Sequence, residues 1–253
     1  MATLMETEQN TAGQERLIRE TEVADLQRVE ISGGLYCVLK RAVDLVASAL
    51  ALLLLAIPMA VIALIIYIND PGKVFFTQKR VGRNGKLFRI IKFRTMRLDA
   101  PKYMATSDVE DPKKYLTPLG RTLRKWSLDE LPQLINVFKG DMSLVGPRPL
   151  IPNEEEIHEM RDRFGVYTVR PGVTGLAQIN GRDTISPAEK VRWDVRYLEN
   201  FGPVLDLKIL FATVPKVFGC EGIVEGYGSH GEFTESKKSA ESAAVNDSSA
   251  DNT

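Results

Sequence analysis

Cysteine and histidine are scarce in this 253-residue chain, with two of each, and their scarcity excludes several kinds of site. Cys37 and Cys220 are too few for a disulfide framework and lack the spacing of metal ligands, so two free thiols fit a reducing compartment. His230 lies in a polar C-terminal stretch, which leaves His158 as the other histidine. A histidine-based triad or a zinc centre is therefore not expected. The chain also has no Asp-x-Asp motif, which counts against a soluble-type glycosyltransferase that binds its metal through that motif.

The chain has no net charge, but its charged residues are unevenly distributed. The net charge is +0, yet residues 31–220 carry 28 Lys and Arg against 19 Asp and Glu, a net of +9. The acidic excess lies in the two ends, which are polar and hold few large apolar side chains. Such segments cannot bury enough apolar surface to fold. We therefore expect disordered tails over residues 1–33 and 221–253 around a basic core.

One stretch has no charged residue at all, from Leu45 to Ile68. As a helix its 24 residues would reach about 36 Å, enough for a hydrocarbon core of about 30 Å. A long polar, acidic stretch precedes it, so we expect no cleavable signal peptide. Pro58 interrupts the helix near its middle, and Lys and Arg flank both ends, so charge does not fix its orientation. The sequence predicts a membrane anchor over residues 34–72, and leaves open a kinked spanning helix or a re-entrant hairpin.

A strongly basic segment follows the anchor. Residues 73–97 contain nine Lys and Arg and no acid, and Arg83-Asn84-Gly85-Lys86 predicts a tight turn between two β-rich arms. Beside a membrane, each cation attracts anionic headgroups by about 1 kcal/mol. The same charges could bind a polyanionic substrate, for which Lys79 and Arg80 are the first candidates. Because no nucleic-acid-binding motif is present, we do not expect a nucleic-acid partner.

Two adjacent carboxylates, Asp129 and Glu130, follow a predicted amphipathic basic helix over residues 118–126. Ser127-x-x-Glu130 matches a capping box and predicts a new helix start. Helix N-termini favour phosphate groups and ionised carboxylates. Ser, Asp and Glu are also ordinary caps with no further role, so the pattern alone leaves both interpretations open.

Arginines beside proline or glycine favour the functional interpretation. Arg148 stands between two prolines, and the chain also contains Arg170-Pro171-Gly172 and Gly181-Arg182-Asp183. A guanidinium on a stiff loop suits bidentate contacts to phosphate. Any one of these loops alone could be simple turn chemistry.

These motifs together resemble a known family over about residues 34–220. The segments that carry the resemblance are Lys40-Arg41-x-x-Asp44, Phe76-Thr-Gln-Lys-Arg-Val-Gly82, Lys92-Phe-Arg-Thr-Met96, Leu119-Gly-Arg-Thr-Leu-Arg124, Ser127-Leu-Asp-Glu-Leu-Pro-Gln133, Gly140-Asp-Met-Ser-Leu-Val-Gly-Pro-Arg-Pro149, Val169-Arg-Pro-Gly-Val-Thr-Gly175 and Gln178-Ile-Asn-Gly-Arg182. The chain is similar to the bacterial sugar transferases, which are monotopic polyprenyl-phosphate phosphoglycosyl transferases. We do not expect the additional membrane helices that longer relatives carry ahead of this unit.

The resemblance implies transfer of a sugar 1-phosphate from a UDP-sugar to polyprenyl (undecaprenyl) phosphate, with release of UMP, at the start of exopolysaccharide, capsule or O-antigen type glycan synthesis. It makes Asp129 the nucleophile and gives Glu130 a role through Mg²⁺. It places residues 73–220 as the catalytic domain on the cytoplasmic face of the bacterial inner membrane. The remaining residues that it implies are Lys79, Arg80, Arg148, Arg182 and Asp194 at the substrate phosphates, and Ile57 and Pro58 at the bend of a re-entrant helix.

The expected fold is helix-rich α+β, with a re-entrant membrane hairpin, interfacial amphipathic helices and a short β-hairpin. Residues 206–218 are a further apolar helix, for which an interfacial position and core packing are both open. The competing function is a non-catalytic membrane scaffold for glycan assembly, which would tolerate Asp129→Asn. The sugar remains open, and a homodimer is one option for the oligomeric state.

Overall fold

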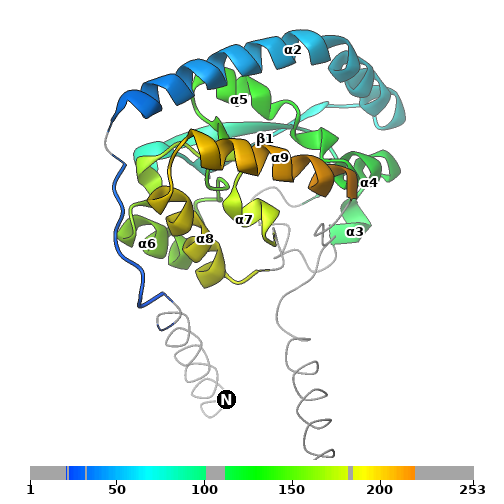
Figure 1. The fold of residues 1–253 in the computed structure, drawn as a ribbon. Helices are drawn as coiled ribbons and strands as arrows, with labels where there is room; N and C mark the ends of the chain where they lie inside the picture. Colours follow the sequence, from blue (N-terminus) through cyan, green and yellow to red (C-terminus); the bar gives the residue numbers. More distant parts are fainter. Residues whose placement is uncertain (1–20, 22, 32, 101–111, 182–184, 220–253) are drawn as a thin grey trace, which may run out of the picture.

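The computed structural model describes residues 21, 23–31, 33–100, 112–181 and 185–219 (Figure 1). It is a helix-rich α+β structure with one long apolar helix and two small sheets. Its elements are α2 (Leu35–Asn69), β1 (Phe75–Val81), η1 (Arg83–Gly85), β2 (Leu87–Phe93), α3 (Pro112–Tyr115), α4 (Pro118–Lys125), η3 (Leu128–Glu130), α5 (Gln133–Lys139), β3 (Ser143–Val145), α6 (Glu155–Arg163), η4 (Val166–Thr168), β4 (Gly172–Thr174), α7 (Leu176–Ile179), α8 (Pro187–Glu199) and α9 (Pro203–Gly219), where η denotes a 3-10 turn.

The uncharged run lies within the single helix α2, which continues through Pro58. Its buried residues are Asp44, Ser48 and Ile66, so its leucine and isoleucine side chains are largely exposed. By length and composition α2 could cross a membrane. It arches over one side of the molecule, above α5, and bends towards its C-terminal end (Figure 1). A proline removes one hydrogen bond from a helix and bends it, so Pro58 accounts for such a bend.

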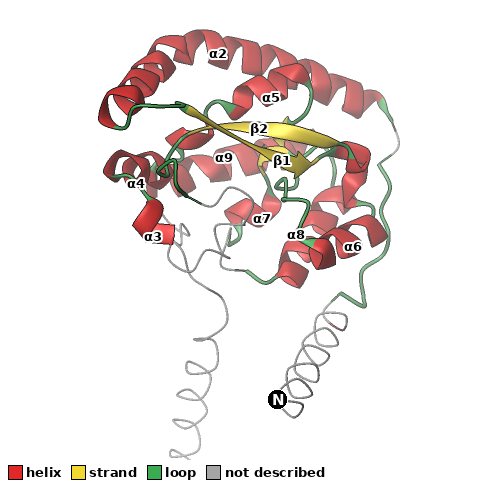
Figure 2. Cartoon of the chain, turned by 180° about the vertical axis from the view of Figure 1, so that it is seen from behind, coloured by secondary structure: helices red, strands yellow, loops and turns green. Residues whose placement is uncertain are grey.

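The predicted hairpin is confirmed. β1 and β2 pair antiparallel, and the turn between them holds Asn84 at φ 55° and Gly85 at φ 71°. Asn and Gly tolerate this left-handed conformation better than other residues, which is why the chain reverses there. Figure 2 shows the hairpin extending beneath α2, with α5 lying between α2 and the turn end of the hairpin.

The predicted basic helix is confirmed as α4. Thr117 caps it by accepting a hydrogen bond from the Gly120 backbone N–H. Leu123 is buried with Phe93 of β2 and Ile66 of α2, so α4 attaches the C-terminal end of α2 to the hairpin.

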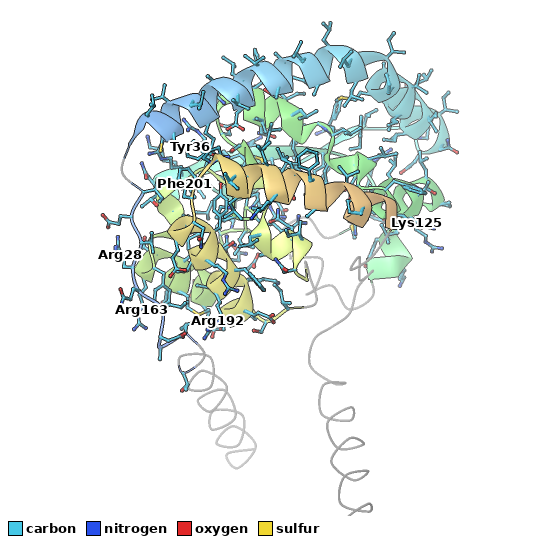
Figure 3. The ribbon with its side chains drawn as sticks, viewed as in Figure 1. Arg28, Tyr36, Lys125, Arg163, Arg192 and Phe201 are labelled. Atoms are coloured by element: carbon cyan, nitrogen blue, oxygen red, sulfur yellow. The ribbon has the colours of Figure 1, made fainter. Side chains whose placement is uncertain are left out.

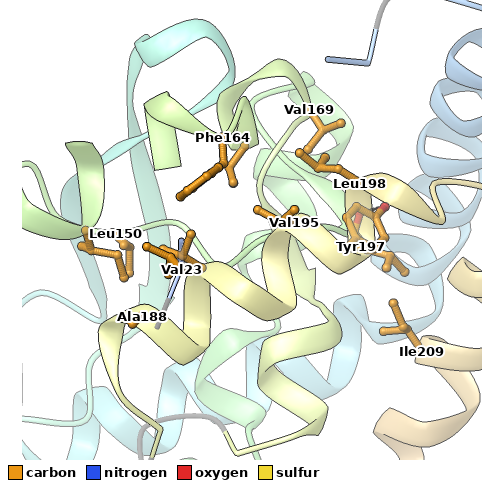
Figure 4. Close-up of a cluster of buried hydrophobic side chains, with 13 residues drawn as sticks. Val23, Leu150, Phe164, Val169, Ala188, Val195, Tyr197, Leu198 and Ile209 are labelled. Carbon is orange, nitrogen blue, oxygen red and sulfur yellow. Dashed lines mark hydrogen bonds between the residues drawn. The ribbon is translucent and has the colours of Figure 1, made fainter. Parts of the chain in front are cut away.

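The main core lies on the side of the hairpin away from α2, where α6, α8 and β3 meet (Figure 4). Val195, Tyr197 and Leu198 of α8 are almost fully buried in it. Val23 is also buried there, and Val29 donates a backbone hydrogen bond to Phe164. Residues 23–31, which composition assigned to the N-terminal tail, therefore pack against the core. Residues 1–20 and 220–253 of the two predicted tails lie outside the described residues.

A carboxylate joins the beginning of α2 to α9. Asp206 accepts hydrogen bonds from Tyr36, Lys40 and Tyr197, at 2.6, 2.5 and 2.9 Å. Tyr36 also stands edge-on to Phe201, with ring centroids 5.0 Å apart (Figure 3). These contacts fix the N-terminal end of α2 to the folded body.

Candidate active site

The two adjacent acids lie in η3, just ahead of α5, rather than inside a capped helix. Ser127 is left-handed at φ 53°, and its side chain makes no capping hydrogen bond, so the predicted capping box is wrong. α5 begins only at Gln133, after Pro132. Pro132 cannot donate a backbone hydrogen bond, so the chain passes through a separate 3-10 turn before the helix. Asp129 is buried in this turn, with 7% of its surface exposed, and Glu130 is partly buried.

Cations surround the pair. Lys92 of β2 donates to Glu130 Oε1 at 2.7 Å, and Arg148 Nη1 lies 3.5 Å from the same oxygen. The pKa of Asp129 is raised from 3.8 to about 6, chiefly by burial. The nearby charge of Lys92 opposes this rise, as do Arg124 and Arg148, whereas the charge of Glu130 adds to it. Asp129 is therefore a buried acid that is still mostly ionised at neutral pH, and the surrounding cations suit an anionic substrate.

Arg148 is held from behind by a buried ion pair. Arg161 of α6 donates to the backbone carbonyl of Arg148 at 2.8 Å, and Arg161 Nη2 lies 2.6 Å from Asp194 Oδ2 on α8. Both Arg161 and Asp194 are almost fully buried. Asp194, predicted among the phosphate-site residues, is thus linked to Arg148 through Arg161.

Strand alternation separates the two cations predicted on β1. Arg80 donates to the backbone carbonyl of Pro149 at 3.4 Å, and its pKa is lowered to about 10, first by burial and then by the charge of Arg148. Lys79 is exposed on the opposite face, directly across from Arg89 of β2. Since successive side chains of a strand point to opposite faces, Arg80 lies on the face of Arg148 and Lys79 on the other face.

The described part of the site therefore contains two residues that the sequence did not single out, Lys92 and Arg161. A lysine between the apolar residues Ile91 and Phe93 was a signal for Lys92, whereas no local pattern marked Arg161. Arg182 lies outside the described residues. Ile57 and Pro58 lie in α2, where Ile57 is 78% exposed.

A small cavity adjoins Arg148. Its walls include Gly82 at the end of the hairpin, Pro147 and Tyr167. The segment after β3 lies beside the start of β4, because the Gly172 N–H donates to the Pro147 carbonyl at 2.9 Å. The cavity thus lies between the hairpin and these two segments, next to the cations of the site.

Comparison with known proteins places this arrangement in a family. Residues 35–220 match the family described as bacterial sugar transferase. The chain is 40% identical over 194 residues to the exopolysaccharide production protein ExoY of Rhizobium meliloti, covering 70% of this chain and 84% of that protein. It is 43% identical over 188 residues to the uncharacterized sugar transferase EpsL of Bacillus subtilis, covering 74% and 90%. It is 40% identical over 193 residues to the UDP-glucose:undecaprenyl-phosphate glucose-1-phosphate transferase of Escherichia coli, covering 73% of this chain and 41% of that longer protein. The chain belongs to the bacterial sugar transferase family.

Proposed function

We propose that this sugar transferase moves a sugar 1-phosphate from a UDP-sugar to undecaprenyl phosphate and so starts the synthesis of a surface polysaccharide. The observation that carries the proposal is the buried Asp129 beside Glu130, with Lys92 and Arg148 directed at the pair. The names of the relatives from Escherichia coli and Rhizobium meliloti support the donor, the acceptor and the exopolysaccharide product.

Two anionic substrates repel each other, and a covalent enzyme intermediate separates their encounters. In the first step an Asp129 carboxylate oxygen attacks the phosphorus that bears the sugar. The Asp129 O–P bond forms, the P–O bond to UMP breaks, and UMP leaves with the electron pair. In the second step a phosphate oxygen of undecaprenyl phosphate attacks the same phosphorus and expels the Asp129 carboxylate, which gives undecaprenyl diphosphate sugar.

The cations give this chemistry its electrostatic support. Arg148 lies beside the acids and is fixed at its backbone by Arg161, so it can hold a phosphate oxygen of the donor without reorganising. Arg80 lies close to Arg148. Lys79 and Arg182 remain predicted phosphate contacts.

The side chains of the site fit Mg²⁺ only if the substrate supplies further ligands. The described residues contain no group of three His, Cys, Asp or Glu that could hold a metal by themselves. Mg²⁺ is commonly bound by one or two carboxylates together with substrate phosphates and water. Glu130 would hold the ion with the donor, and the ion would supply neutralisation of the pyrophosphate charge.

We also propose that α2 is re-entrant, because both of its ends are attached to the same folded body. Near its beginning, Arg41 donates to the Val137 carbonyl at 2.7 Å and Asp44 accepts from the Leu144 N–H at 3.0 Å. Near its end, Ile66 is buried against β2 and α4. Asp44 and Ile66 are separated by about 33 Å of helix, comparable to the membrane core, so a spanning helix would carry them to opposite sides.

A bend at Ile57-Pro58 would instead dip the middle of α2 into one leaflet and keep both ends on the cytoplasmic face of the inner membrane. The exposed apolar residues of α2 would then meet lipid rather than water. α9 offers a second apolar surface, with Val204, Leu207, Phe211 and Val214 exposed at helical spacing. A homodimer remains compatible with this arrangement.

Two measurements test the proposal. The purified protein with Mg²⁺, undecaprenyl phosphate and a panel of UDP-sugars should release UMP with at least one donor, and Asp129→Asn should not. Without acceptor, a donor with a radiolabelled sugar should label the protein, and the label should leave when acceptor is added. Asp99→Asn, an exposed acid paired with Arg97, is the matched control and should behave like the parent.

Turnover without protein labelling would replace the covalent mechanism by direct transfer. Full activity of Asp129→Asn would remove Asp129 as the nucleophile. Absence of UMP release with every donor, in a folded protein, would favour the scaffold.

A further inference from the structure

A second group of cations lies at the opposite end of α5 from the catalytic acids. Arg41 of α2 donates to the carbonyls of Val137 and Phe138, at 2.7 and 2.9 Å. Arg170, which precedes β4, donates through Nε to the carbonyl of Gly140 at 2.9 Å. A methyl group at Gly140 would lie 3.2 Å from Arg41 Nη2, so both guanidinium groups meet at this residue.

Arg83 adds a third charge from the hairpin turn. Its Nε is buried and has no hydrogen-bond partner among the described residues. Its turn, η1, lies against η4, the 3-10 turn shortly before Arg170. Burial lowers the pKa of Arg170, and the charges of Arg83 and then Arg41 lower it further, which agrees with three neighbouring cations.

Within the part of the chain that the structure describes, no carboxylate forms an ion pair with any of the three. Asp44 raises the pKa of Arg170 from a distance, but its Oδ1 accepts a hydrogen bond from the Leu144 backbone. The surplus positive charge of the cluster is therefore not neutralised by a direct contact.

Capping the end of α5 explains only part of this arrangement. Cations near a helix C-terminus are favourable by about 0.3–1 kcal/mol, and the bonds of Arg41 and Arg170 to three carbonyls serve that purpose. A guanidinium group has five N–H donors, and the bonds to the described residues use only three of the donors in the cluster. Arg83 caps nothing in α5 and adds like-charge repulsion. An anion bound between the three would remove that repulsion.

We propose that Arg41, Arg83 and Arg170 form a binding site for a phosphate group, separate from the catalytic site. Planar guanidinium groups converging from different elements match the oxygens of a phosphate. The acids precede α5 and the cluster follows it, so the two sites are separated by the seven residues of the helix, or about 10 Å. Arg41 lies on α2 near the exposed Val38 and Val43, where a lipid headgroup could reach it. A soluble phosphate ester has the same chemistry.

The test uses the full-length protein and measures binding rather than activity, so it does not depend on the proposed reaction. Arg83→Gln is the main variant, because Arg83 makes no capping contact. Lys86→Gln is the matched control, since it removes one positive charge from the same turn. In the lipid arm, native mass spectrometry of the detergent-solubilised protein compares retention of phosphatidic acid with that of phosphatidylcholine. In the soluble arm, equilibrium dialysis measures inorganic phosphate in an Arg148→Gln background, so that the catalytic site does not mask the result.

Arg83→Gln should weaken phosphatidic acid binding by about tenfold, because it loses charge-assisted hydrogen bonds, whereas Lys86→Gln should not. Weakening in the lipid arm alone supports a headgroup site, and weakening of inorganic phosphate binding supports a site for any phosphate group. Arg83→Lys should recover part of the affinity because it keeps the charge without the planar fork. If Arg83→Gln binds both ligands as Lys86→Gln does, the site does not exist.

Discussion

Replacing Asp129 with asparagine should abolish activity and, at neutral pH, stabilise the protein. Asp129 is almost fully buried, and its pKa is raised from 3.8 to about 6. At 1.36 kcal/mol per pH unit, that difference makes the ionised carboxylate destabilising by about 3 kcal/mol at pH 7. Asparagine has nearly the same shape without the charge, so the variant should recover a large part of this energy.

The effect of Asp129→Asn on the free energy of unfolding should depend on pH. An acid whose pKa is higher in the folded protein contributes stability when it is protonated. That contribution is complete below about pH 4 and is lost as the pH rises through about 6. The parent and Asp129→Asn should therefore be equally stable near pH 4, and the variant should be more stable above pH 6.

Thermal unfolding of the detergent-solubilised protein, followed by tryptophan fluorescence at pH 4 and pH 7, measures the effect. For a chain of this size 1 kcal/mol corresponds to about 2–4 °C, so the midpoint at pH 7 should rise by several degrees. Asp99→Asn, an exposed carboxylate, should leave the midpoint unchanged. A midpoint for Asp129→Asn at or below that of the parent at pH 7 would mean that the neighbouring cations fully compensate the buried charge.

Further consequences concern the pH profile, the support of Arg148 and the bend of α2. The rate of UMP release should fall below about pH 6 as Asp129 is protonated. Lys92→Gln should move this acidic limb of the pH profile to higher pH, because the charge of Lys92 is the largest one that lowers the Asp129 pKa. An unmoved limb would contradict that assignment. Asp194→Asn leaves Arg161 buried without its counter-charge, so unfolding should become easier by about 3–5 kcal/mol, and kcat should fall more than KM changes; a change in stability alone would show a purely structural pair. Pro58→Ala removes the missing hydrogen bond and the ring clash, which together cost a helix about 3 kcal/mol. It should therefore shift α2 towards spanning, which labelling of an N-terminal tag from outside the cell would detect. A tag that stays protected in both proteins would leave Pro58 without this role.

Sequence patterns predicted the elements whose cause is local. The hairpin followed from Arg83-Asn84-Gly85-Lys86, because a left-handed turn needs Asn or Gly there. α4 followed from apolar residues at helical spacing, and α2 from an uncharged run. Ser127-x-x-Glu130 misled because a capping box requires an extended backbone at its first residue, and Ser127 is left-handed.

The contacts that assemble the site join residues far apart in the chain. Lys92 and Glu130 are 38 residues apart, and no local periodicity indicates that β2 passes beside η3. Asp194 was identified as an acid of the site, but its pairing with Arg161 depends on how α6 packs against α8. Burial of Val23 likewise depends on tertiary packing, because a short apolar segment within a polar stretch carries no clear signal.

The apolar helix α2 also helps to assemble the site, because two of its polar residues bond to the elements that carry the site. Arg41 bonds to the end of α5, the helix that follows Asp129 and Glu130. Asp44 bonds to the Leu144 N–H in β3, the strand that leads to Arg148. The spacing between the carboxylates and the arginine is therefore set partly by the first three turns of α2. With the membrane-held acceptor proposed above, the element that would set the depth of the protein in the membrane would also set the geometry of the proposed catalytic groups.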